Sequence, residues 1–90
     1  MTDDVVHELQ QLHVGGARLG EPETDGLPGG WQIVIRTWGR SRCGRELCDA
    51  LVIPPHPQVG WRTAGELTSA RKARLRAAAE IQQHLAKEHR

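Results

Sequence analysis

Two segments in the middle of the chain, residues 31 to 38 and residues 47 to 53, have the alternating pattern of half-buried β-strands. The first reads WQIVIRTW, and the second reads LCDALVI and stops at Pro54 and Pro55. Alternation with a period of two residues, together with β-branched side chains, favours strands. A turn rich in Gly and Arg lies between the two segments. We therefore expect them to pair as an antiparallel hairpin.

A long helix is predicted in the last third of the chain, which contains SARKARLRAAAEIQQHL at residues 69 to 85. Thr63 and Glu66 form a T-x-x-E capping box, so we expect the helix to begin there and to run to about Lys87. At about 100° per residue, small and apolar residues share one arc of this helix. They are Leu67, Ala70, Ala77, Ala78, Ile81 and Leu85. Such small side chains allow the helix to pack closely on a sheet.

The N-terminal residues TDDVVHELQQL predict a short amphipathic helix, because acids occupy its first turn and Val5, Leu9 and Leu12 recur at helical spacing. Residues 17 to 20 predict a weak first strand, and residues 59 to 62 a short extended piece. The expected fold is α+β, with an N-terminal helix, a three-stranded antiparallel sheet and a long C-terminal helix packed on the sheet (α-β-β-β-α). Ninety residues with 38% hydrophobic content suffice for one small domain, residues 1 to 90.

The sequence offers little for catalysis, metal binding or membrane insertion. No nucleophile with a neighbouring base stands out, so we expect no enzyme activity, no cofactor and no small-molecule substrate. A zinc site built from Cys43, Cys48, His84 and His89 is disfavoured, because the two histidines point about 140° apart on a continuous helix. No apolar run approaches the roughly 20 residues that cross a bilayer, and Met1 is followed by acids rather than by a signal segment. We expect a cytoplasmic protein without a membrane partner.

Charge is distributed unevenly along the chain. Residues 1 to 30 hold one arginine against six acidic residues, a net charge of −5, whereas residues 36 to 76 hold nine basic residues against three acidic ones, a net charge of +6. This asymmetry points to a charged partner, and it also fits a domain whose two halves attract each other. The candidate phosphate contacts lie in the start of the last helix and in the hairpin turn. They are Arg71, Lys72, Arg74, Arg76, Arg40, Arg42 and Arg45.

Three stretches of the sequence carry a resemblance to a known family. The last helix contains S-x-x-x-A-R-x-x-A-A at residues 69 to 78, VVHELQQL occupies residues 5 to 12, and DGLPGGWQIVI leads from a loop into the central strand. Taken in their order along the chain, helix, strands and helix, they resemble the double-stranded RNA-binding domain. The resemblance implies that the start of the last helix grips phosphates through Arg71, Lys72 and Arg74. It also implies that Glu8 and Gln11 of the first helix lie near the sugar 2′-hydroxyls of a minor groove.

Two classes of function follow from these features. The first is a nucleic-acid-binding module that holds duplex RNA or DNA through backbone phosphates without sequence specificity. The alternative is a small interaction or inhibitor protein, of bacterial or phage type, that uses its charged surfaces against a protein partner. Binding that falls steeply with salt distinguishes the first class, because counterion release drives it.

Overall fold

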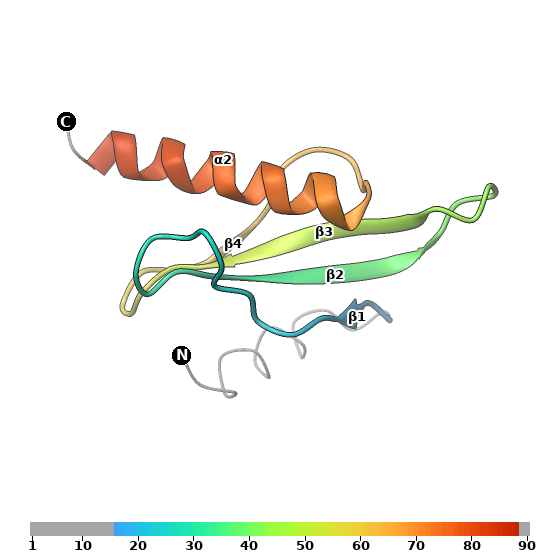
Figure 1. The fold of residues 1–90 in the computed structure, drawn as a ribbon, viewed down its shortest axis with the longest axis horizontal. Helices are drawn as coiled ribbons and strands as arrows, with labels where there is room; N and C mark the ends of the chain where they lie inside the picture. The colour runs from blue at the N-terminus through green and yellow to red at the C-terminus, as the bar shows by residue number, and fades with distance from the viewer. Residues whose placement is uncertain (1–15, 89–90) are drawn as a thin grey trace.

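The computed structural model describes residues 16–88. Its strands are β1 (Arg18–Leu19), β2 (Gln32–Arg40), β3 (Glu46–Ile53) and β4 (Trp61–Arg62), and the helix α2 spans Ala70–Glu88. The strands form one antiparallel sheet in the order β1-β2-β3-β4. Helix α2 lies along one face of this sheet (Figure 1). The α+β class and the long C-terminal helix are thus confirmed, while the predicted N-terminal helix lies outside the described residues.

The central hairpin has the strands that the alternating pattern predicts. Ile33 pairs with Val52 and Ile35 with Ala50, so that the odd-numbered residues of β2 share a face with the even-numbered residues of β3. The register shifts between Thr37 and Gly39, which is a β-bulge near the end of β2. The hairpin therefore has one continuous apolar face for α2 and extends beyond it towards the turn.

The sheet has four strands rather than the expected three. The extended piece predicted near residues 59 to 62 forms β4, in which Trp61 pairs with Val52 and Arg62 with Leu51. A Cβ at Gly60 would lie 2.5 Å from the Val52 carbonyl oxygen, so glycine permits this close approach of the two chains. The backbone groups of β3 would otherwise form an open sheet edge, and β4 supplies their partners.

Helix α2 begins later than the capping box predicts. The Thr63 side chain is drawn into the sheet, where its Oγ1 accepts a hydrogen bond from the Ala50 N–H at 3.1 Å. The helix cap is instead Ser69, whose Oγ accepts from the Lys72 N–H at 3.2 Å. Leu67, which we expected on the packed arc, lies before the helix and is exposed. The prediction of a helix start at Thr63 was wrong because pairing with the edge of β3 competes for the same residue.

The main core lies between α2 and the sheet. Ala73, Ala77 and Ile81, spaced at i, i+4 and i+8, are completely buried against the apolar face of β2 and β3. Trp31 is buried, and Trp61 packs against the same core with its ring centroid 5.9 Å from that of Trp31. The small side chains of α2 thus allow a close approach of the helix and the sheet.

Candidate nucleic-acid interface

The hairpin turn and the start of α2 lie at the same end of the molecule. Cys48 of β3 and Thr68, which directly precedes the helix cap, exchange backbone hydrogen bonds of 2.6 and 2.8 Å. Between the two segments runs a groove of about 720 Å³, with Ser41 and Arg45 on one wall and Ser69 and Lys72 on the other. Figure 1 shows this end of the sheet, where the hairpin projects beyond the helix. Two regions far apart in the sequence thus form one surface.

Of the predicted phosphate contacts, Arg45 and Lys72 line this groove, and five in all belong to the end of the hairpin or to the first turn of α2, which together we call the basic end. They are Arg40, Arg42, Arg45, Arg71 and Lys72. Within residues 16–88, none of their side chains has a hydrogen bond or an ion pair. The nearby Glu46 carboxylate lies 3.5 Å from Arg18 Nη2, in an exposed pair. The basic end therefore holds a concentration of cations that are free to contact an anionic partner.

Arg74, which the resemblance places on phosphate, is paired within the chain. Its Nε and Nη2 donate to the two carboxylate oxygens of Glu23 at 2.8 and 3.0 Å. These hydrogen bonds raise the pKa of Arg74 above its ordinary value, against a smaller lowering by burial. The pair joins α2 to the segment before β2. It is a direct contact between the acidic and the basic half of the sequence.

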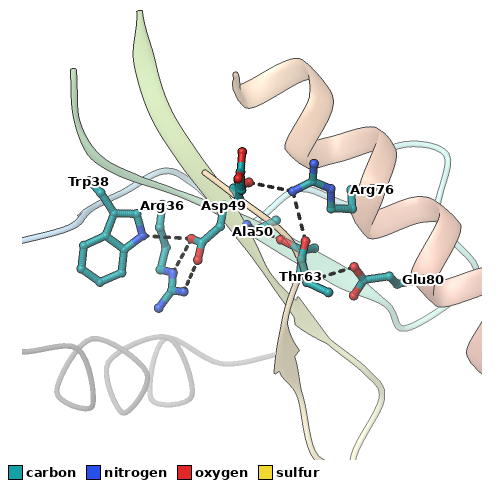
Figure 2. Close-up of polar contacts among 9 residues, drawn as sticks. Arg36, Trp38, Asp49, Ala50, Thr63, Arg76 and Glu80 are labelled. Atoms are coloured by element: carbon teal, nitrogen blue, oxygen red, sulfur yellow. Dashed lines mark hydrogen bonds and ion pairs between the residues drawn. The ribbon is translucent and has the colours of Figure 1, made fainter. Parts of the chain in front are cut away.

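Arg76 also has a structural role. Its Nη1 donates to the carbonyl oxygens of Ala64 and Glu66 at 3.0 and 2.8 Å. Glu80, one turn further along α2, accepts from the Ala64 N–H and from Trp61 Nε1, both at 2.9 Å. Figure 2 shows both side chains reaching from α2 to the loop after β4. Arg76 and Glu80 therefore fix this loop to the helix, and Arg76 does not belong to the basic end.

Arg36, counted among the basic residues of the middle segment, is completely buried. Its guanidinium forms a two-point contact with the Asp49 carboxylate, in which Nε donates to Oδ1 at 2.7 Å and Nη2 donates to Oδ2. The Trp38 indole lies 4.9 Å from the guanidinium carbon, and its Nε1 donates to Asp49 at 3.2 Å (Figure 2). This cluster lies on the face of the sheet opposite α2 and adds no cation to the surface.

The structure thus brings two of the nine predicted contact residues, Arg45 and Lys72, to one groove and assigns Arg74 and Arg76 to other contacts. Arg40 and Arg42 lie in the adjoining end of the hairpin, and Arg71 lies in the first turn of α2. Glu8 and Gln11 lie outside the described residues. Sequence reasoning missed Ser41 and Ser69, which line the groove. The signal for Ser69 was its position directly before A-R-K, which is typical of a helix cap. The competing T-x-x-E pattern six residues earlier concealed it.

Other chemistry is limited in the described part of the chain. Cys43 is exposed and Cys48 buried, both as free thiols. No group of three or more His, Cys, Asp or Glu residues among positions 16–88 is arranged to hold a metal ion. No helix within this range is both long and apolar enough to cross a bilayer. No family model, curated protein or solved structure matches this chain.

Proposed function

We propose that this protein is a nucleic-acid-binding module that holds a duplex by its phosphates without reading base sequence. In this proposal the basic end is the contact surface. The protein acts in the cytoplasm as a binding module rather than an enzyme, and it requires no cofactor. A short helix formed by residues 2 to 12 precedes the sheet and completes a fold with a helix at each end of the chain.

The observation that carries the proposal is the meeting of two cationic segments around one groove. Arginine guanidinium groups present planar N–H pairs that match phosphate oxygens, and lysine adds a point charge. The start of α2 adds the positive end of the helix dipole, and Ser69 and Ser41 add hydroxyl donors beside it. Such a surface attracts a closely spaced row of phosphates more strongly than it attracts isolated anions.

The composition of the groove favours a duplex over a single strand. Proteins that bind single strands combine cations with aromatic side chains on which the bases stack. None of the residues that line this groove in the described part of the chain is aromatic. Phosphate contact without stacking fits a partner whose bases are already stacked within a double helix.

The test compares two pairs of charge removals in the full-length protein. In the first variant Arg45 and Lys72 are both replaced by glutamine; in the matched control Arg62 and Lys87, exposed cations away from the basic end, are replaced in the same way. Affinity for duplex RNA, duplex DNA and single strands is measured at about 50 and 200 mM salt. We expect the first variant to lose duplex affinity for every sequence and to reduce the salt slope by about two, with little effect from the control.

If both variants lost the same duplex affinity, the attraction would depend on overall charge, and a specific binding site at the basic end would be ruled out. A parent protein that binds no duplex at low salt would overturn the proposal altogether. In that case a stoichiometric partner recovered in a pull-down would identify the interaction or inhibitor protein of the alternative reading.

A further inference from the structure

Strand β4 is an open edge of the sheet. It stands last in the strand order, and no other strand within residues 16–88 pairs with its outer side. The Thr63 N–H donates to the Ala50 carbonyl oxygen at 2.9 Å, which makes these two residues a hydrogen-bonded pair. Because bonded and non-bonded pairs alternate along an antiparallel ladder, the next residue, Arg62, forms a non-bonded pair with Leu51. The N–H and C=O groups of Arg62 therefore point away from β3.

The carbonyl group of Gly60 points the same way. By the same alternation, Trp61 and Val52 form a hydrogen-bonded pair, so the Trp61 N–H points towards β3. Across a trans peptide bond the preceding carbonyl points in the opposite direction, which for Gly60 is away from the sheet. Gly60 and Arg62 are both exposed. The outer side of β4 thus offers backbone donors and acceptors to a further strand.

Helix α2 closes the same edge beyond Arg62. The Ala64 N–H donates to the Glu80 carboxylate at 2.9 Å, and the Ala64 carbonyl oxygen accepts from Arg76 at 3.0 Å. Side chains of α2 therefore occupy the backbone groups that follow β4. The open part of the edge is short, and it consists of Gly60 and Arg62.

We propose that a second copy of this chain pairs with this edge, so that two sheets join through their β4 strands. In a two-fold antiparallel arrangement centred on Trp61, the Arg62 N–H of each copy donates to the Gly60 carbonyl oxygen of the other. A two-fold interface must be self-complementary, and an edge with a donor and an acceptor two residues apart meets that condition. The sheet becomes continuous across the two copies.

Charge and backbone occupancy select this register. An axis centred on Arg62 would place the two guanidinium groups directly opposite each other, and like charges in that position are destabilising. It would also place Gly60 opposite Ala64, whose backbone groups are already bound to α2. With the axis at Trp61, each Arg62 lies opposite a glycine and meets no like charge.

Apolar side chains lie where the second copy would cover them. Val59, just before the open edge, is 87% exposed, and in this register it lies opposite Thr63 of the second copy. The two Trp61 residues form a non-hydrogen-bonded pair, the kind in which side chains approach most closely. Trp61 also lines a groove of about 690 Å³ between the edge and α2, which gives the indole of the second copy room.

This inference goes beyond the proposed function and does not depend on it, because it concerns the pairing of two copies of the chain. The two-fold axis turns the second sheet end for end. The two basic ends therefore face in opposite directions, and each remains open to a duplex.

The test measures the mass of the full-length protein by analytical ultracentrifugation at increasing concentration. We expect the mass to rise from that of one chain to that of two at concentrations below about 1 mM. Arg62→Pro removes the outward N–H and leaves the bonds to β3 intact, because edge strands accept proline where the N–H faces solvent. It should raise the Kd of the dimer at least about tenfold, since two equivalent hydrogen bonds are lost. The control Arg62→Ala keeps the N–H and should dimerise at least as well as the parent.

A second pair of variants decides the matter if Arg62→Pro unfolds the protein. Val59→Asp places a charge in the proposed interface and should weaken the dimer, whereas Leu75→Asp changes a residue on the outer face of α2 that is 62% exposed and should not. The inference is overturned if the parent is monomeric at every concentration, in which case the edge stands alone or receives a strand of another protein. It is also overturned if folded Arg62→Pro dimerises as the parent does, or if Val59→Asp has no more effect than Leu75→Asp.

Discussion

At the scale of single residues, the position of a cation in the sequence says little about its role. Arg36, Arg74 and Arg76 belong to the same basic segment as Lys72, yet each is engaged within the fold. Their partners lie far away in sequence, as Glu23 does from Arg74, and only the pairing of strands and helix brings them together. For this reason the sequence predicted the charge asymmetry but not which cations remain available.

The pair of Arg36 and Asp49 gives a prediction at this scale. Removing one member of a buried ion pair leaves an uncompensated charge, so Asp49→Ala should lower the free energy of unfolding by about 3–5 kcal/mol. The control Glu46→Ala removes the exposed partner of Arg18, a pair worth about 0–1 kcal/mol. Urea denaturation of both variants measures the difference. Equal stability of the two variants would show that Arg36 is not buried as a charged group.

At the scale of elements, local sequence patterns predicted the strands and the last helix, but they did not predict the residue at which the helix begins. The alternation in residues 31 to 38 and 47 to 53 is a local property, and so is the small-residue arc of α2. The position of Thr63 is not set by local sequence. Its hydroxyl accepts a hydrogen bond from the Ala50 N–H, and Ala50 belongs to β3, which precedes Thr63 in the sequence. An open sheet edge thus overrides a capping pattern that is valid in isolation.

The start of α2 supplies the second prediction. If Ser69 is the cap, Ser69→Ala should lower the free energy of unfolding by about 1 kcal/mol, because the Lys72 N–H loses its partner. Glu66→Ala serves as the control, since the Glu66 side chain is exposed and only its backbone carbonyl is used, by Arg76. Thermal or urea unfolding of the two variants decides the matter. If Glu66→Ala lowered the free energy of unfolding more than Ser69→Ala does, the predicted capping box of Thr63 and Glu66 would be supported instead.

At the scale of the whole molecule, the candidate interface depends on topology. The cations of the hairpin turn and of the helix start are about thirty residues apart in sequence, and the pairing of Cys48 with Thr68 joins them. Sequence reasoning nominated both groups separately and had no means of placing them around one groove. The hairpin also projects beyond the helix, which gives the basic end its extent along the molecule (Figure 1).

This extent leads to a prediction about the size of the duplex site. Beyond Cys48, where the helix start joins the sheet, β3 continues for two residues, Leu47 and Glu46, about 7 Å or about 2 base pairs at about 3.4 Å each, and then enters the turn. A binding mode that also used a first helix in a second minor groove would span about 16 base pairs, as the resembled family does.

We therefore expect a duplex of about 10 base pairs, one helical turn, to bind one copy as tightly per site as longer duplexes do. A duplex of about 20 base pairs should then bind two copies, as measured by titration calorimetry or native mass spectrometry. If affinity instead rises sharply only when the duplex reaches about 16 base pairs, the contact extends beyond the basic end and includes residues such as Glu8 and Gln11.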